Sequence, residues 1–200
     1  MSFERVRFRA TDGVWLSGWK ITAALGRPWV IFCHGLGANR SDLLELAANL
    51  FTRRFNLLLF DFRGHGESGG RGTTFGFHEQ RDLEGALAYL GTQPEVGDRP
   101  YGAVGVSMGA SVALAVAARD ERLHALALAE PKTPRELIQQ SLGQAPWAPL
   151  TRSLAALASA AYRSWLAEPY EAPTPPERLL VSPRGRLGEG AVELFEEALI

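Results

Sequence analysis

The sequence is short of several features that mark particular classes of protein. It contains one cysteine, Cys33, so no internal disulfide can form and a reducing compartment is expected. It has no run of 18 apolar residues, which argues against a membrane-spanning helix. Lysine occurs only at Lys20 and Lys132, the arginines are scattered and the formal net charge is −1, so nucleic-acid binding is not indicated. The first residues do not resemble a signal peptide, and we expect a cytoplasmic protein.

What is present fits a single soluble domain. A chain of 200 residues can bury a substantial core, and we expect one domain over residues 1–200. Alternating charge over residues 3–9 and the turn at Asp12-Gly13 predict an N-terminal β-hairpin. Continuous apolar runs at 29–33 and 55–60 predict strands that are buried on both faces.

Beyond the hairpin, predicted strands and helices alternate along the chain. The expected elements are helices over 41–50 and 76–90, strands over 101–104, 123–129 and 178–181, and a last helix from 191. Alternation of this kind builds a mostly parallel sheet with helices on both faces, an α/β fold. Residues 133–172 are rich in alanine and leucine, and we interpret them as a helical cap over the carboxyl ends of the strands. Core helices are the alternative.

The motif Gly105-Val106-Ser107-Met108-Gly109 is the strongest functional signal. A short apolar segment precedes it and an alanine-rich helical segment follows, the strand–turn–helix setting of a nucleophilic serine. The glycines allow strained backbone angles, and the helix N-terminus favours negative charge near the serine oxygen. The alternative is a turn of small residues that only lets the helix pack closely on the sheet.

A second glycine-bearing loop follows the first buried strand, at His34-Gly35-Leu36-Gly37. Such a loop, beside the serine turn, can direct backbone N–H groups toward a developing oxyanion. The amides of Leu36 and Met108 are the expected donors. We interpret His34 as structural rather than as a general base, because the end of the strand fixes its position.

A third loop, Asp61 to Gly69, follows the next strand. Its spacing Gly64-x-Gly66-x-x-Gly69 also fits a dinucleotide-binding motif, with an aspartate roughly 20 residues further on. No helix is expected at the third glycine, however, so a bound phosphate would lack a helix N-terminus. We therefore favour a polar network that braces the loop, formed by Asp61, Arg63 and His65.

Together these three motifs resemble the α/β-hydrolase superfamily, in particular its esterase, lipase and peptidase-like members with a helical cap. The likeness extends over about residues 3–131. The resemblance implies that Ser107 is the nucleophile, that Leu36 and Met108 supply the oxyanion-hole amides, and that residues 133–172 form the cap. It implies no metal ion and no cofactor.

The resemblance is incomplete after Ser107, where the family places first an acid and then a histidine. The chain has one later histidine, His124, expected at the far end of its strand, and one later aspartate, Asp120. Arg186 stands where an acid is expected, and Glu189 lies nearby. Glu130, which ends the predicted strand 123–129, is the better candidate for the acid.

The general base has no evident counterpart. We expect the chain to end at Ile200 before the unit that carries the family's histidine, which leaves His65 and His78 as unconventional substitutes. One hypothesis is a serine hydrolase that acts on a small ester, thioester or amide with an apolar acyl group. The alternative is a catalytically silent or truncated relative that binds an apolar small molecule or a protein partner. An unpaired apolar edge at 179–181 would favour a homodimer.

Overall fold

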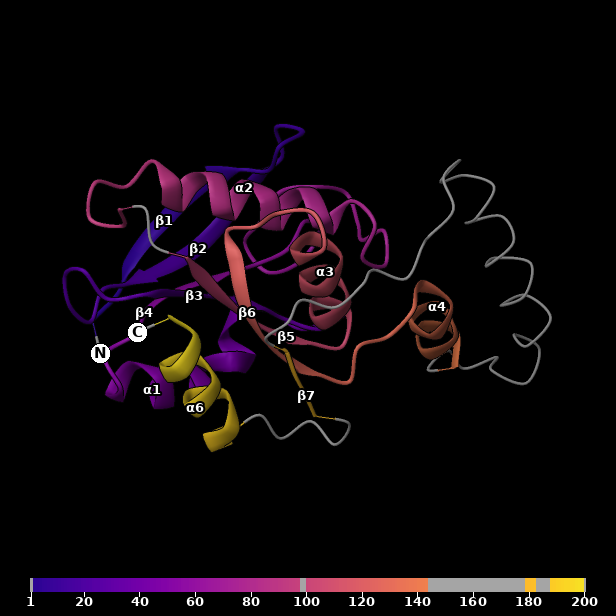
Figure 1. The fold of residues 1–200 in the computed structure, drawn as a ribbon. Coiled ribbons are helices and arrows are strands. Elements are labelled where there is room, and N and C mark those ends of the chain that lie inside the picture. Colours follow the sequence, from indigo (N-terminus) through magenta and orange to yellow (C-terminus); the bar gives the residue numbers. More distant parts are fainter. Residues whose placement is uncertain (1, 98–99, 144–178, 183–187, 200) are drawn as a thin grey trace.

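A seven-stranded sheet forms the centre of the protein (Figure 1). The structure is a computed structural model that describes residues 2–97, 100–143, 179–182 and 188–199. The strands are β1 (Glu4–Arg9), β2 (Trp15–Ile21), β3 (Trp29–Cys33), β4 (Asn56–Phe60), β5 (Tyr101–Val106), β6 (Leu123–Ala129) and β7 (Leu179–Ser182). The helices are η1 (Arg40–Leu43, a 3₁₀ turn), α1 (Leu44–Thr52), α2 (Glu79–Gly91), α3 (Met108–Ala117), α4 (Pro134–Gly143) and α6 (Gly188–Leu199).

The strand order is β1-β2-β4-β3-β5-β6-β7. β1 and β2 form the expected antiparallel hairpin, and β2 pairs antiparallel with β4. Every later pair in the sheet is parallel. The mostly parallel α/β sheet with an N-terminal hairpin, predicted from the sequence, is therefore confirmed. Because the parallel strands share one direction, the loops that follow β3, β4 and β5 meet at one edge of the sheet.

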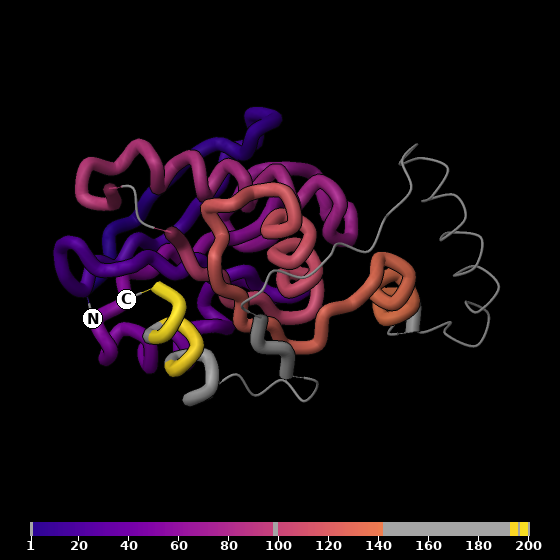
Figure 2. Tube along the Cα trace, viewed as in Figure 1, coloured from indigo at the N-terminus to yellow at the C-terminus, as the bar shows by residue number. Residues whose placement is uncertain are grey.

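Helices cover both faces of the sheet and create two apolar cores. On one face, α2 and α3 pack together over a core that includes Ile31, Leu58 and Leu126. On the other face, α1 and α6 lie side by side, as Figure 2 shows, over a core that includes Phe32 and Leu57. Successive side chains of a strand point to opposite faces of the sheet, so each buried strand contributes residues to both cores.

Helix α6 packs closely on the sheet because β5 carries a glycine at the contact. A Cβ atom at Gly102 would lie 2.8 Å from the Phe195 ring, so no larger residue fits there. The Phe195 ring also meets Phe55 edge-on, with centroids 6.2 Å apart. The last helix thus closes the core beneath the strand that leads to Ser107.

Several predicted boundaries are confirmed and a few shift. β3 and β6 have the predicted bounds, since a continuous apolar run leaves little choice of register. The helix expected from residue 41 instead begins with η1, where Asn39 caps the backbone and Asp42 closes a capping box. The helix expected from residue 76 begins at Glu79, because residues 73–76 form a loop that Glu79 holds.

The predicted cap falls largely outside the described residues. α4 begins the segment, with a reciprocal cap in which Thr133 and Glu136 each accept a hydrogen bond from the other's backbone N–H. Residues 144–172 are not described. Within the described part of the chain, no helix has both the length and the apolar character needed to cross a bilayer.

Candidate functional site

Ser107 occupies a sharp turn between β5 and α3. Its backbone has φ 54° and ψ −114°, a conformation that residues with a side chain rarely adopt. The N–H of Ser107 donates to the carbonyl of Ala129 at 2.8 Å, so the turn remains tied to the neighbouring strand. The side chain is partly exposed, and Met108 begins the helix directly after it. The expected strand–turn–helix setting of the motif is therefore present.

Both glycines of the motif are required by close backbone contacts. A Cβ atom at Gly105 would lie 2.6 Å from Cα of Ala110, in the first turn of α3. A Cβ atom at Gly109 would overlap the carbonyl oxygen of Cys33 at 2.1 Å. Because of these contacts, the first turn of α3 packs directly against the end of β3, and the position of Ser107 between β5 and α3 is fixed.

A second contact fixes α3 from the side of β6. The Ser111 hydroxyl donates to the carbonyl of Lys132 at 2.6 Å and accepts from the Lys132 N–H at 2.8 Å. Between that contact and β6 lies Glu130, whose side chain is exposed and whose φ is 48°. Since Ala129 pairs with Val106 in the sheet, Glu130 follows its strand at the same edge as Ser107.

The loop after β3 lies against Ser107. A Cβ atom built on Gly35 would be 3.4 Å from Cβ of Ser107 and 4.0 Å from its hydroxyl oxygen, so glycine brings this backbone close to the serine. The next N–H, that of Leu36, has no acceptor among the described residues. Met108 is the first residue of α3, and its N–H has no intrahelical acceptor. Both amides expected to form the oxyanion hole thus belong to segments that adjoin Ser107.

His34 is fully buried at the end of β3, and both of its ring nitrogens are engaged. Nε2 accepts from the N–H of Phe62 at 3.0 Å, and Nδ1 lies 2.8 Å from the carbonyl oxygen of Gly35, to which it donates. Burial lowers the pKa of His34, although the bond to Gly35 opposes that shift. A neutral ring therefore links the loop after β3 to the loop after β4, in agreement with a structural role.

His65 makes a similar link between the same two loops. Its Nε2 accepts from the N–H of Gly37 at 3.2 Å, and its Nδ1 lies 2.9 Å from the carbonyl of Arg63. The His34 and His65 rings meet edge-on, with centroids 5.1 Å apart. Because both nitrogens of His65 already have partners, the ring would have to leave them before it could accept a proton from Ser107.

Asp61 is the centre of the network that the sequence predicted in the loop after β4. Its carboxylate is 1% exposed and accepts from the backbone N–H groups of Arg40 and Glu67, each at 2.8 Å. The Arg40 guanidinium bridges the carboxylates of Asp61 and Glu67. Gly66 is needed here, since a Cβ atom at that position would overlap the Asp61 carboxylate. The carboxylate of Asp61 is thus committed to holding the loop.

Arg63 anchors the same loop on its other side. Its guanidinium donates to both oxygens of Asp12 at 2.8 Å and to Asp82 at 2.6 Å and 2.9 Å. The hydrogen bonds from Arg63 lower the pKa of Asp12 to about 2, whereas burial raises the pKa of Asp82 to about 6 against the same attraction. The hairpin turn, the loop after β4 and α2 are therefore joined through one guanidinium.

These contacts also decide against dinucleotide binding. No helix begins at Gly69, and α2 begins ten residues later at Glu79. Asp82, the acidic residue required by that alternative, is 0% exposed and bound to Arg63, so it cannot reach a ribose.

Glu79 is a buried residue of the site region that the sequence analysis did not single out. It is 0% exposed, and its carboxylate accepts from the hydroxyls of Thr73 and Thr74 and from the N–H groups of Thr74 and Gly76, at 2.7–2.9 Å. The Thr73 hydroxyl oxygen also lies 3.5 Å from Sδ of Met108. The signal in the sequence was a pair of adjacent threonines five and six residues before a glutamate. Their hydroxyl groups can donate to a carboxylate at the start of the following helix.

No histidine of the chain is bonded to Ser107. All four histidines lie in the described residues, and none forms a hydrogen bond with the serine hydroxyl. His78 precedes α2 beside Phe77, and burial together with Arg81 lowers its pKa. Of the other acid candidates, Asp120 is paired with Arg122, Glu189 lies in the first turn of α6, and position 186 is outside the described residues.

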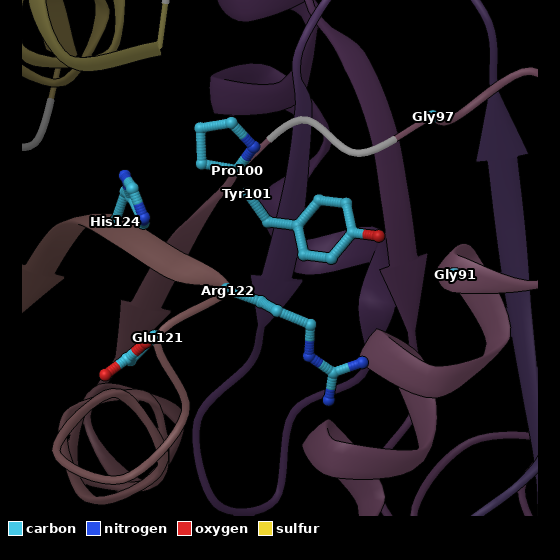
Figure 3. Close-up of a pocket in the computed structure, with 7 residues that line it drawn as sticks. All are labelled: Gly91, Gly97, Pro100, Tyr101, Glu121, Arg122 and His124. Atoms are coloured by element: carbon cyan, nitrogen blue, oxygen red, sulfur yellow. The ribbon is translucent and has the colours of Figure 1, made fainter.

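His124 lies at the opposite end of the sheet from Ser107. It is the second residue of β6 and lines a cavity of about 460 Å³ that opens at the amino ends of β5 and β6 (Figure 3). The other lining residues are Gly91, Gly97, Pro100, Tyr101, Glu121 and Arg122. Since Ser107 follows the carboxyl end of β5, this cavity is not part of the serine site.

Comparison with known proteins agrees with this geometry. The family model described as alpha/beta hydrolase fold matches residues 28–164. The uncharacterized protein YfhR of Salmonella typhimurium is 36% identical over 117 residues, which cover 56% of this chain and 39% of that protein. The uncharacterized protein Rv2307c of Mycobacterium tuberculosis is 34% identical over 145 residues, covering 72% of this chain and 50% of that protein. The chain therefore spans half or less of the length of these curated relatives.

Among solved structures, the esterase Pf2001 of Pyrococcus furiosus superposes with a TM-score of 0.69 at 26% identity, over 98% of this chain and 77% of that one. The alpha/beta hydrolase GrgF of a Penicillium species, at 23% identity and a TM-score of 0.63, shares the fold. These similarities agree with the arrangement described above, a strained serine turn at the carboxyl edge of a mostly parallel sheet. The chain belongs to the alpha/beta hydrolase fold family.

Proposed function

We propose that the protein is a serine hydrolase that cleaves a small ester, thioester or amide with an apolar acyl group through an acyl-enzyme on Ser107. The observation that carries this proposal is the backbone of Ser107, a residue with a side chain held at positive φ between a strand and a helix. The esterase Pf2001, similar to this chain at 26% identity, supports the choice of reaction.

In the proposed reaction, Oγ of Ser107 forms a bond to the carbonyl carbon of the substrate, and the π electron pair moves onto the carbonyl oxygen. The amides of Leu36 and Met108 would donate to that oxyanion. Each such donor is worth about 10²–10³ in rate in enzymes of this kind. Collapse of the intermediate breaks the bond to the leaving group, which takes up the proton that Ser107 lost. Water then attacks the acyl-enzyme, and a proton of that water returns to Oγ as its bond to the acyl carbon breaks and the acid leaves.

Ser107 must lose its proton in the first step, and the group that accepts this proton needs an acidic residue to orient or stabilise it. In the proposed reaction, that role falls to Glu130. Glu130 follows β6 at the edge where Ser107 stands, and its carboxylate is exposed. We assign it as the acid that orients or stabilises the proton acceptor. A carboxylate in that position acts through an imidazole or a water molecule rather than as a strong base itself.

A second function is favoured by one specific observation, the absence of a histidine bonded to Ser107. In that case the protein is a catalytically silent member of the family that binds an apolar small molecule or a protein partner. Both functions use the same fold, but they differ in the reactivity of one hydroxyl group.

The reactivity of Ser107 separates the two functions. We expect a fluorophosphonate probe to label the protein at Ser107, as located by peptide mass spectrometry, and Ser107→Ala to abolish the label. Ser141→Ala is the matched control, because Ser141 is an exposed serine on α4, and its label should equal that of the unchanged protein. A folded protein that stays unlabelled would reject the hydrolase proposal in favour of the silent function.

A further inference from the structure

One face of the N-terminal hairpin carries a row of arginines. Along β1 the burial alternates, so that Val6 and Phe8 turn into the core while Arg5, Arg7 and Arg9 are exposed on the other face. The register of the hairpin pairs Arg9 with Trp15 and Arg5 with Trp19, so these tryptophans share the arginine side of the sheet. We call this surface the arginine face, and its members are Phe3, Arg5, Arg7, Arg9, Trp15 and Trp19.

The core side of the hairpin is occupied, whereas the arginine face is exposed along β1. On β2 the loop after β4 covers the middle of this face, where the hydroxyl of buried Ser17 donates to the carbonyl of Glu67 at 3.0 Å. Phe8 stacks on Tyr89 of α2, with ring centroids 5.0 Å apart, and this contact closes the core side. On the other side, Phe3 is 49% and Trp15 is 42% exposed. Phe3 lies against Trp19 with centroids 5.1 Å apart, which places it at one end of the row, and Trp15 stands at the other end.

The arginines of this face have no carboxylate partner. In the described part of the chain, no acidic side chain lies within ion-pair distance of Arg5, Arg7 or Arg9. Arg7 and Arg9 instead hold their guanidinium groups over the Trp15 ring, at 5.3 Å and 4.3 Å from its centroid. Cation–π contact positions a guanidinium but leaves its N–H donors available to an anion, apart from the one that Arg9 directs at the carbonyl of Gly13 at 3.3 Å. Three guanidinium groups without an ion pair therefore lie along about 14 Å of strand. Arg5 is close enough to Glu67 for its charge to add to the lowering of that carboxyl's pKa, which Arg40 dominates.

Two large exposed apolar side chains, Phe3 and Trp15, belong to this face. In the described residues, the large hydrophobic side chains that remain exposed are Phe3, Trp15 and Leu25, all within the hairpin or the turn that follows it. Aromatic rings favour the headgroup level of a bilayer, and guanidinium groups favour its phosphates. The arginine face has guanidinium groups along β1 and an aromatic ring at each end, so it carries both kinds of group that favour the bilayer surface.

We propose that the arginine face docks this protein reversibly on a membrane surface that contains anionic phospholipid. Lipid headgroups move laterally, so they can gather beneath a row of cations without a shaped pocket, whereas a folded acidic partner needs carboxylates at fixed positions. Duplex DNA also holds its phosphates at fixed spacing, so it suits this row less well than mobile headgroups do, and it is one outcome of the test. This inference does not depend on the hydrolase activity of Ser107.

The test is co-sedimentation of the protein with phosphatidylcholine vesicles that contain or lack phosphatidylserine. One arginine near an anionic surface contributes about a fivefold gain in partitioning. We therefore expect the triple variant Arg5→Gln, Arg7→Gln, Arg9→Gln to partition roughly 100-fold more weakly than the unchanged protein onto phosphatidylserine vesicles. Binding of the unchanged protein should be largely lost in about 1 M salt, where charges are screened beyond about 3 Å.

The matched control removes the same charge elsewhere, with Arg71→Gln, Arg119→Gln and Arg122→Gln, and it should bind as the unchanged protein does. Thermal unfolding of both triple variants checks that each is folded. Equal loss in the two variants would show a net-charge effect and overturn the proposal. So would equal binding to vesicles without phosphatidylserine, or binding to soluble poly-glutamate or duplex DNA with none to vesicles.

Discussion

At the scale of single residues, the serine turn depends on space that only glycine leaves free. Gly109 meets the carbonyl oxygens of Cys33 and His34, and Gly105 meets the backbone of Ala110. Backbone atoms cannot move aside as the end of a flexible side chain can, so each contact constrains the relation of α3 to β3. Packing therefore holds the turn in a conformation that the backbone of Ser107 does not itself favour.

Gly109→Ala tests this constraint directly. The added methyl group would overlap the Cys33 carbonyl oxygen at 2.1 Å, so we expect a loss of about 3 kcal/mol or more in the free energy of unfolding. Gly72→Ala is the control, because a Cβ atom there has open space and an ordinary φ, and it should change stability by less than about 1 kcal/mol. Equal urea midpoints for the two variants would contradict the prediction.

Burial of His34 predicts a pH dependence of stability. Because burial lowers the pKa of the folded ring below 6.5, the unfolded chain takes up this proton first as the pH falls. The contribution of His34 is therefore complete above about pH 6.5 and is lost as the pH falls toward the folded pKa, by at most about 1.4 kcal/mol per pH unit.

Urea unfolding between about pH 8 and about pH 5 measures this slope. We expect His34→Gln to be less stable than the unchanged protein at the upper end, since it loses the bond from Phe62, and to show a shallower decline toward acid. A decline of the same steepness in both proteins would show that other groups carry the pH dependence.

At the scale of elements, the loops that follow β3 and β4 are held by charged groups that lie far apart in the sequence. Arg63 joins the hairpin turn at Asp12 to α2 at Asp82, and Glu79 holds residues 73–76 against Met108. Removing one partner of such a buried network leaves another charge without its bonds. The loops near Ser107 are thus held by Arg63 through the hairpin turn and α2, and by Glu79 through residues 73–76.

Glu79→Gln measures how far the serine turn depends on this loop. The amide keeps one carbonyl oxygen but directs N–H groups at the donors of Thr74 and Gly76, so we expect a loss of about 1–3 kcal/mol in stability. We also expect slower labelling of Ser107, because the loop supports Met108. Glu84→Gln, on the same helix and paired with Arg119 at the surface, should cost less than about 1 kcal/mol and leave labelling unchanged.

The elements and the serine turn were predictable from the sequence because their signals are local. The apolar runs at β3 and β6 fix their own bounds, and the glycines around Ser107 mark the turn. The partners of Arg63 were not predictable, since Asp12 lies 51 residues away in the chain and nothing in the local sequence connects the two. The helix expected from residue 41 is capped two residues earlier, at Asn39, because asparagine and serine both cap helices and only the backbone decides between them.

At the scale of the whole molecule, the sheet ends in two different edges. β1 carries exposed arginines, which discourage strand pairing, whereas β7 carries Leu179, Leu180 and Val181. β7 is the last strand in the order, and no described strand pairs with its outer side. The predicted homodimer, if formed through this edge, would leave the hairpin and its arginine face at the far side of each subunit.

Self-association through β7 is open to direct measurement. Because an apolar edge that no described strand covers is a template for another strand, we expect the mass from light scattering to rise toward that of a dimer as the protein is concentrated. The control is the same series in mild urea below the unfolding transition, where edge pairing should weaken first. A constant monomer mass over the whole range would refute the prediction.

The positive φ of Ser107 has a lasting consequence for the protein. A non-glycine residue in such a region raises the energy of every folded copy by about 1–3 kcal/mol, a burden that glycine would remove with a single exchange. In the hydrolase proposed above, that free energy is the cost of presenting the nucleophilic oxygen of Ser107 to a substrate.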